Sequence, residues 1–300
     1  MGQEVNGVKG KLGIDINIEE VKNWTITNEE NIIIGIVDTG LDVKSGNISQ
    51  QICIKEEEAK NKCDDDKNGY VDDYYGWDFY NNDSSIYDNY LYDYHGTYIA
   101  NLILDVAPKV KLISSKFLKG TKGEANDSIQ AIEYAINNGA NIINCSWCFS
   151  VDEKKLYNLI KQNEDIIFVC AAGNSNLDLD ENKVFPASYQ LDNVISVMGI
   201  DNQGKIYDLS GFGSAVTIAA PGKDIWVTLP ENDQEFVDGT SVSTAFVSAT
   251  VALMKMLNPE LTPKEIKNIL IGTASKIDAI HDKCQAGGCI NVAQALKRCK

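Results

Sequence analysis

The chain has 300 residues, of which 44% are hydrophobic and 23% charged, and these values are ordinary for a soluble globular protein. The composition excludes the disordered, collagen-like and coiled-coil classes. Asp and Glu number 43 against 27 Lys and Arg, so the net charge is −16. Such a chain is repelled by phosphate backbones, so nucleic acid is not an expected partner and metal cations are.

The apolar stretches of the chain are short. The longest, 242–254, contains four Ser and Thr residues, and it falls short of the ~20 residues that a helix needs to cross a bilayer. We therefore expect no membrane span. Residues 1–6 lack the apolar core of a secretory signal, so the chain is either cytosolic or the mature part of a longer precursor.

Runs rich in Ile and Val recur along the chain and are hydrophobic at nearly every position. This pattern is typical of strands that are buried on both faces of a parallel sheet. It predicts strands at 32–37, 110–114, 142–145, 166–170, 194–197 and 216–219.

Helical segments separate several of these runs. Asp127 as N-cap and Gly139 as a stop signal frame the first of them. Another has small or apolar residues on every face, which predicts a buried helix. The predicted helices are 127–138, 151–162, 241–257 (the buried one) and 262–272.

The alternation of strands and helices predicts an α/β fold. We expect a doubly wound, mostly parallel sheet with helices on both faces, built by a single domain over residues 1–300. A polar stretch rich in Asp and Tyr, 55–94, interrupts the alternation.

Eight cysteines are ambiguous in a chain of this length. Cys145 and Cys148 form a single CxxC pattern, which is a weak redox or zinc signal. Cys145 and Cys170 lie in apolar runs and are predicted to pack as small buried hydrophobes. The other five cysteines are predicted to lie in loops and are the candidates for disulfide bonds: Cys53, Cys63, Cys284, Cys289 and Cys299.

Four polar residues stand at strand ends or helix starts, where α/β proteins carry their active sites. Asp38 ends the first strand, His95 precedes the apolar segment 98–104, Asn174 follows a strand, and Ser241 opens the buried helix. Each of them alone has a structural interpretation, as a turn or cap residue. Together they are the set that acyl transfer by an activated hydroxyl requires.

Asp38-Thr39-Gly40 also matches the signature of aspartic proteases, which need two such loops. No second Asp-Thr/Ser-Gly occurs, and the strand–helix alternation contradicts an all-β fold.

The order Asp, His, Ser and the strings around these residues resemble the subtilisin-like serine proteases. The matching strings are IIIGIVDTGLD, HGTYIA, VAPKVKL, FVCAAGNSN, FPASYQLDNVISV, APGKDI and DGTSVSTAFVSATVALM. The resemblance covers residues 13–275 and leaves a Cys-containing tail, 276–300. It implies a serine endopeptidase that hydrolyses protein or peptide substrates through an acyl-enzyme.

The resemblance also implies residue roles. Ser241 would attack the peptide carbonyl, His95 would take its proton, and Asp38 would orient the imidazole. Asn174 and the backbone N–H of Ser241 would hold the oxyanion. The first specificity pocket would have Ser146, Trp147 and Cys148 as one wall and Ala171, Ala172 and Gly173 as the other.

The sequence departs from the family pattern at five positions. Tyr94, Tyr98, Asn101, Cys148 and Ala245 stand where the family usually has Gly, His, Gly, Gly and Pro. None of these changes removes a triad atom, but Tyr94 and Cys148 add bulk beside the cleft. The alternative function is therefore a weak or inactive pseudoprotease that acts as a binding module in the same fold.

The polar stretch contains a candidate calcium loop with five Asp residues among ten positions, 64–73. The spacing of its first residues is that of an EF-hand loop, although Tyr75 replaces the final Glu. We predict a structural calcium ion held by Asp64, Asp66, Asn68, the Tyr70 carbonyl and Asp72. The bland alternative is a solvated acidic loop.

The string NGYVDDYYGWDF resembles subtilases of apicomplexan parasites and some bacteria. Together with the abundance of Lys, Asn and Ile and with the cysteines, it indicates a parasite enzyme that is extracellular or in the secretory pathway. The resemblance further implies a zymogen with an inhibitory prodomain that is not in this chain.

Overall fold

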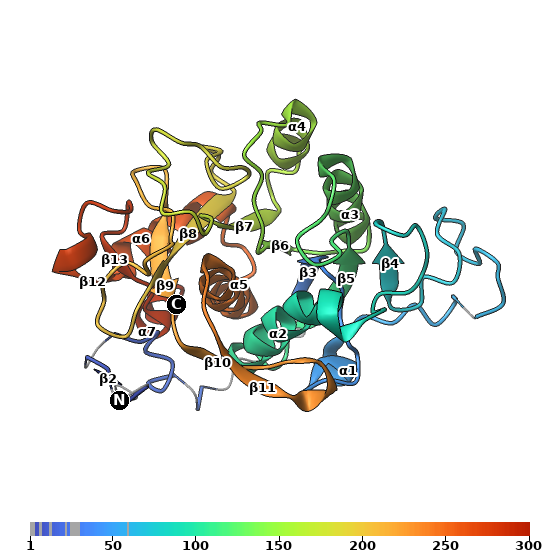
Figure 1. Cartoon of the computed structure of the whole chain (residues 1–300), viewed down its shortest axis with the longest axis horizontal. Helices are drawn as coiled ribbons and strands as arrows, with labels where there is room; N and C mark the ends of the chain where they lie inside the picture. Colours follow the sequence, from blue (N-terminus) through green and yellow to red (C-terminus); the bar gives the residue numbers. More distant parts are fainter. Residues whose placement is uncertain (1–3, 6–7, 12–13, 22, 25–30, 59) are drawn as a thin grey trace.

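The computed structural model describes residues 4–5, 8–11, 14–21, 23–24, 31–58 and 60–300. The predicted start of the family resemblance, residue 13, lies outside these residues, as do parts of the predicted domain before residue 31. Figure 1 shows a central sheet with helices on both sides.

A sheet of nine strands forms the centre of the described structure, in the order β12-β13-β9-β8-β7-β6-β3-β5-β4. Its neighbours pair in parallel except for β12 and β13, which confirms the predicted doubly wound, mostly parallel sheet. The strands are β3 (Ile33–Asp38), β4 (Gly76–Asp78), β5 (Lys111–Lys116), β6 (Ile142–Cys145), β7 (Ile167–Ala171), β8 (Val194–Ile200), β9 (Ile218–Pro221), β12 (Ser275–Lys276) and β13 (Gly288–Cys289).

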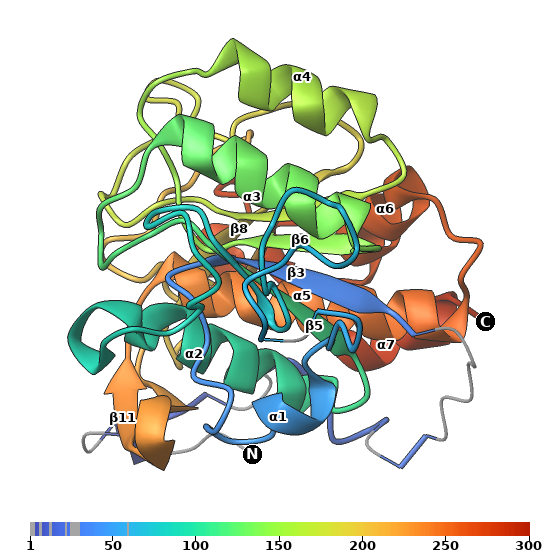
Figure 2. The ribbon, with the colours of Figure 1, turned by 90° about the vertical axis from the view of Figure 1, so that its right-hand side faces the viewer.

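Two helical layers enclose this sheet. Figure 2 shows α3 and α4 above it and α2, α5 and α7 below it. The two small antiparallel pairs, β1 with β2 and β10 with β11, lie outside the sheet. The helices are α1 (Ile48–Gln51), α2 (Tyr90–Val106), α3 (Ala125–Asn137), α4 (Lys154–Gln162), α5 (Thr240–Leu257), α6 (Pro263–Thr273) and α7 (Val292–Arg298), and the small strands are β1 (Glu4–Val5), β2 (Val8–Lys9), β10 (Ile225–Thr228) and β11 (Gln234–Val237).

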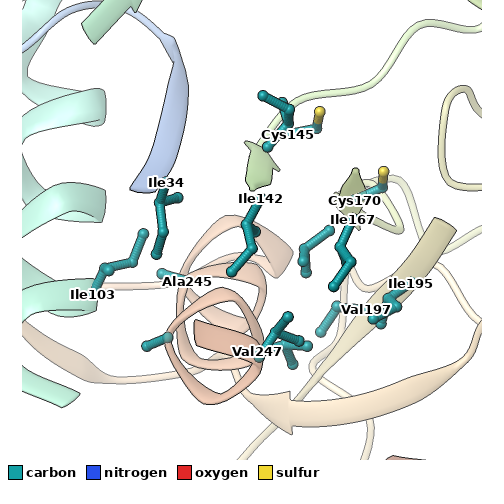
Figure 3. Packing of buried hydrophobic residues seen from close by; sticks show 14 of the residues in the cluster. Ile34, Ile103, Ile142, Cys145, Ile167, Cys170, Ile195, Val197, Ala245 and Val247 are labelled. Carbon is teal, nitrogen blue, oxygen red and sulfur yellow. The ribbon is translucent and has the colours of Figure 1, made fainter. Parts of the chain in front are cut away.

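Helix α5 is the centre of the core, as its all-round apolar composition predicts. It packs against β3, β6, β7, β8 and β9, and Ile34, Ile142 and Ile167 point toward it (Figure 3). It is also the one helix of the described residues that is long and apolar enough to cross a membrane, but 83% of its 18-residue window is buried inside the structure. Burial in a protein core accounts for that composition.

The predicted strands are confirmed to within two residues at their starts, and all four predicted helices occur. Gly139 ends α3 with a φ of +90°, and the Ala140 N–H bonds to the Ala135 carbonyl, which is the bonding of a glycine stop. The N-cap prediction was wrong: Glu124 precedes α3, and Asp127 lies in its first turn. Helix α4 begins at Lys154, three residues later than predicted.

The cysteines differ from the sequence prediction in part. Cys145 and Cys170 are fully buried, as predicted. All eight cysteines are free, and Cys284, Cys289 and Cys299 are buried in the core and do not lie in exposed loops. The structure therefore gives no support to the disulfide prediction.

Candidate active site

Asp38 and His95 meet at the carboxyl end of strand β3. Asp38 is the last residue of that strand and is fully buried, while His95 lies in the second turn of α2. The His95 Nδ1 atom lies 2.7 Å from Asp38 Oδ1, and the same oxygen accepts the Thr39 N–H. This contact orients the imidazole and leaves its Nε2 edge available, since 23% of the His95 side chain is exposed.

Glycine allows α2 to approach the end of β3 closely. A Cβ at Gly96 would lie 2.4 Å from the Gly40 carbonyl and 3.2 Å from the Asp38 Cβ. The Gly96 N–H donates to the Thr39 hydroxyl, and the Asp42 N–H donates to the Thr97 hydroxyl. The turn after Asp38 therefore docks directly on the helix that carries His95.

Ser241 lies in the first turn of α5 and is 7% exposed. Its backbone N–H is one of the first four N–H groups of the helix. These groups have no partner inside the helix and form the positive end of its dipole. The Ser241 hydroxyl donates to the Ser146 carbonyl at 3.0 Å. Among the described residues no hydrogen bond joins Ser241 Oγ to His95, although α5 and α2 pack against each other.

A buried chain of polar side chains ties the start of α5 to β6. Ser248 donates to Asn144, Asn144 donates to Ser146, and the Ser146 hydroxyl donates to the Ser241 carbonyl, at 2.8, 2.9 and 3.0 Å. Asn144 and Ser248 were not among the predicted site residues. An Asn inside the apolar run 142–145 was the signal, because a buried amide needs partners.

Asn174 follows β7 and faces the start of α5. Its Oδ1 accepts both the Thr240 N–H and the Thr240 hydroxyl, at 2.9 and 3.0 Å. This fixes the amide so that Nδ2 is free to donate elsewhere. A Cβ at Gly239, where φ is +148°, would lie 3.3 Å from that Nδ2 atom, so glycine leaves room for the amide.

The two predicted pocket walls come together at Cys148. Trp147 is anchored by a 2.8 Å bond from its Nε1 to the Val37 carbonyl. The Cys148 sulfur lies 3.3 Å from where a Cβ of Gly173 would be. Ser146, Ala171 and Ala172 are all buried. Burial also raises the pKa of the Cys148 thiol, so it packs as a neutral group.

The other departures from the family pattern are accommodated in the structure. Tyr98 is buried and sets its ring edge-on to the His95 imidazole, with ring centroids 4.9 Å apart. Burial and the nearby Asp38 carboxylate raise the Tyr98 pKa well above its usual value. Asn101 donates to the Thr228 carbonyl and the Ser45 hydroxyl, and Tyr94 is exposed. Ala245 is buried within α5.

The acidic loop gathers three carboxylates, of which one was not predicted. Oxygens of Glu58, Asp64 and Asp66 lie within 4.8 Å of one another. Glu58 is fully buried and accepts the N–H groups of Asp66 and Asp72. It precedes the EF-hand spacing and was missed for that reason, although the acidic run 56–58 was visible.

The other predicted calcium ligands have different partners in the structure. The Asn68 amide donates to Asp66 and Asp73, and its Oδ1 accepts the Tyr70 N–H. The Asp72 carboxylate turns to the N–H groups of residues 61 and 62. The Lys55 ammonium lies 3.1 Å from Asp66 and 2.8 Å from Asp73. The Asp72 carboxylate is therefore not part of the cluster that Glu58, Asp64 and Asp66 form.

Comparisons with known proteins identify a sequence family and similar folds. The sequence model of the subtilase family matches residues 29–288. The chain is 28% identical over 325 aligned residues to subtilisin-like protease 1 of Plasmodium berghei (strain Anka), covering 95% of this chain and 53% of the relative. Against subtilisin-like protease 1 of Plasmodium falciparum (isolate 3D7) the values are 29%, 95% and 46%. The chain thus spans about half the length of these curated relatives.

A bacterial relative and two solved structures are also similar. Subtilisin DY of Bacillus licheniformis is 30% identical over 217 residues, covering 68% of this chain and 77% of that protein. The A-subunit of the AB5 toxin from E. coli superposes with a TM-score of 0.74 at 24% identity, covering 96% of this chain and 98% of that chain. A cold-adapted subtilisin-like serine proteinase gives 0.70 at 22% identity, covering 91% and 95%. At these identities the two structures support the fold alone.

Proposed function

Because this chain belongs to the subtilase family, we propose that it is a serine endopeptidase that acts through Asp38, His95 and Ser241. The observation that carries the proposal is the 2.7 Å contact between Asp38 and His95. Helix α2, which carries His95, packs against α5, whose first turn contains Ser241. Its substrates are peptides or proteins.

In the proposed reaction, Ser241 Oγ attacks the carbonyl carbon and its proton passes to His95 Nε2. Asp38 stabilises the imidazolium that forms. The peptide bond then breaks as the proton passes from His95 to the leaving amine, and water releases the acyl group from Ser241. This requires the Ser241 hydroxyl to turn from the Ser146 carbonyl to His95, since catalytic hydrogen bonds are often incomplete without substrate.

The developing oxyanion would be held by two donors, the Ser241 backbone N–H and Asn174 Nδ2. The anchoring of Asn174 Oδ1 by Thr240 supports this role, because a donor that is already fixed costs no reorganisation during the reaction. Both donors lie at the first turn of α5.

A fluorophosphonate probe tests the proposal, because it labels only an activated serine. We expect labelling of the wild type and none of Ser241→Ala. His95→Ala should lower peptide hydrolysis by about 10⁶ in kcat, and the double variant should be hardly worse, because triad residues act as a unit (the magnitude is that of the subtilisin worked example). Absence of labelling in folded wild type would favour the pseudoprotease, a binding module, which the Ser241–Ser146 bond and the bulk of Cys148 suggest as the second candidate.

We also propose that the acidic loop binds a structural calcium ion. The donor set fits, because Glu58, Asp64 and Asp66 supply clustered hard oxygen atoms and calcium accepts six to eight of them at flexible angles. Asn68 and the Tyr70 carbonyl remain ligands predicted from the spacing. Asp72 was predicted as well, but its carboxylate accepts the N–H groups of residues 61 and 62 and would have to turn away from them to reach the ion. Bound calcium would neutralise the loop and hold it compact.

Thermal unfolding with calcium and with a chelator tests this site. A hundredfold excess of calcium over Kd should stabilise the wild type by about 2.7 kcal/mol. Glu58→Gln should remove most of that response, and Asp192→Asn, at an exposed surface pair, should keep it. An equal response of Glu58→Gln and wild type would place any ion elsewhere.

We further propose that the protein works outside the cell or in the secretory pathway and is made as a zymogen with an inhibitory prodomain. The length of the Plasmodium relatives supports the prodomain, since each is about twice as long as the segment that matches this chain. Mass spectrometry of the native protein from its source would test for a removed N-terminal segment.

A further inference from the structure

A buried lysine lies beside the catalytic strands without being part of the proposed triad. Lys116 ends β5 and is 1% exposed. Its ammonium is paired with three carboxylates: Asp78 at 3.0 Å, Asp93 at 3.1 Å, and Asp88. Asp78 and Asp93 are buried as completely as the lysine itself. Burying a charge is costly unless it is paired, so an arrangement of this kind fixes the parts of the chain that supply it.

The three carboxylates come from three segments of the chain. Asp78 ends β4, Asp88 lies in the connection that follows, and Asp93 lies in the first turn of α2. Asp93 Oδ2 also accepts the N–H groups of Asp88 and Asn89, the residues that lead into the helix. Asp93 is two residues before His95. The ammonium therefore holds the beginning of the helix that carries the proposed catalytic base.

The lysine also lies beside the turn that follows Asp38, the residue that forms the Asp38–His95 dyad with His95. Asp38 and Lys116 are paired residues of the parallel strands β3 and β5, and the Asp38 carbonyl accepts the N–H groups of Phe117 and Leu118. A Cβ at Gly40, in the turn after Asp38, would lie 2.9 Å from Lys116 Cδ. The same turn packs on Gly96 of α2 from the other direction.

We propose that Lys116 is a positioning residue for the reaction. Its stem packs against the turn after Asp38 and its ammonium holds Asp93, so one side chain sets how the helix with His95 approaches the strand with Asp38. This inference rests on the proposed function, since it assigns Lys116 to the geometry of the proposed triad. Lys116 itself touches no reacting atom.

Asp93→Asn and Asp78→Asn form a matched pair that tests the proposal. Each removes one buried carboxylate from the same ammonium, at nearly equal distance, and each keeps an amide oxygen to accept the neighbouring N–H groups. Asp93 connects the lysine to α2, and Asp78 connects it to β4. Both variants should lower the unfolding temperature, but only Asp93→Asn, which alters α2, should change the geometry of Asp38 and His95.

We expect Asp93→Asn to lower kcat per titrated active site by about tenfold to a hundredfold, the scale of a misplacement near 1 Å, with KM within twofold. The pH midpoint of kcat/KM, which reports the free enzyme's base, should move as well. Asp78→Asn should stay within twofold in kcat with an unmoved midpoint. Lys116→Met should behave like Asp93→Asn, and Lys116→Arg should restore part of the loss, because it keeps the charge. Lys267→Met, a partly buried lysine of α6, serves as the control for the substitution itself.

A second measurement does not depend on activity. The chain has only two histidines, so isotope-labelled histidine gives two imidazole signals by NMR, and the exposed His281 is an internal control. Asp93→Asn should shift the resonances and the titration midpoint of His95 and leave those of His281 unchanged, and Asp78→Asn should leave both unchanged. Failure of wild type to react with fluorophosphonate would refute the proposed function, and the NMR comparison would still decide the role of Lys116. Equal effects of Asp93→Asn and Asp78→Asn on kcat and on the His95 signal would overturn the proposal.

Discussion

Replacing Gly96 by Ala should separate the helix that carries His95 from the strand that carries Asp38. The added Cβ would lie 2.4 Å from the Gly40 carbonyl oxygen, whereas real Cβ atoms essentially never come within 3.0 Å of another heavy atom. The contact must therefore lengthen by about 0.6 Å or more, because both partners are backbone-anchored and neither can rotate away. The His95–Asp38 contact of 2.7 Å lies one residue from that clash.

Two opposing terms set the effect on stability. Alanine favours a helix over glycine by about 0.5–1 kcal/mol, and forcing a methyl group into a packed contact costs about 1–3 kcal/mol. We expect a net loss of up to about 2 kcal/mol in the free energy of unfolding. A shift of 0.6 Å or more at the dyad should lower kcat by about tenfold to a hundredfold with a smaller change in KM.

Gly272→Ala is the matched control, because it is also a glycine in a helix but has no heavy atom within 4 Å of the added Cβ. It should gain about 0.5–1 kcal/mol and leave kcat unchanged. Unfolding is measured by denaturant titration in the Ser241→Ala background, which prevents self-cleavage, and kcat is measured with Ser241 intact. If Gly96→Ala kept the kcat of wild type, the close approach of α2 to the turn after Asp38 would not determine the geometry of Asp38 and His95, and this prediction would be refuted.

Three further substitutions test separate parts of the site and the core. Asn174→Leu should lower kcat by about 10² to 10³ with little change in KM, since it removes an oxyanion donor; a change confined to KM would assign Asn174 to substrate binding. Cys148→Gly should raise kcat/KM by about tenfold for peptides with a large residue before the cleaved bond, because accommodating one or two more methylene groups is worth about that factor. Unchanged preferences among peptides that differ in that residue would contradict this prediction. Burial raises the pKa of Cys299 to about 11. Between pH 9 and pH 11 the thiol therefore stays neutral in the folded protein but ionises in the unfolded chain, which favours unfolding. Cys299 alone should therefore lower the free energy of unfolding by about 3 kcal/mol between pH 9 and pH 11, at about 1.4 kcal/mol per pKa unit, and Cys299→Ala should reduce that fall in denaturant titrations.

The sheet was the most predictable part of the fold. Its strands are buried on both faces, so their hydrophobic runs are continuous and stand out from the rest of the chain. Helix α2 was less visible, because its first turns, Tyr90 to Tyr94, are polar or exposed and only 98–104 reads as apolar. The β10–β11 ribbon gave no signal, since its side chains are mostly exposed or half-buried and its pairing is not fixed by a core face.

The candidate site was predictable where a strand end or helix start fixes the residue. Asp38 and Asn174 lie at or just after strand ends, which parallel pairing brings to one edge of the sheet, and Ser241 lies at a helix start. The direction of the Ser241 hydroxyl was not predictable, because it depends on a rotamer choice between the Ser146 carbonyl and His95. The hydrogen bond between Asn144 and Ser248 and the carboxylates around the lysine at the end of β5 were also not predictable, because the partners are distant in sequence.

The acidic loop shows why spacing alone does not assign ligands. The EF-hand pattern expects the sharp turn at Gly69, but the chain also adopts a positive φ at Lys67 and Asp72, where the pattern expects none. The positive φ at Asp72 accompanies a carboxylate that caps the N–H groups of residues 61 and 62. Glu58, six residues before the first Asp of the pattern, folds back beneath the loop, where burial and two backbone N–H donors fix it. A carboxylate that is buried and hydrogen-bonded on both oxygens is already held in place before a cation binds. The spacing of residues along the chain does not contain this information. Such preorganisation makes Glu58 the stronger ligand candidate.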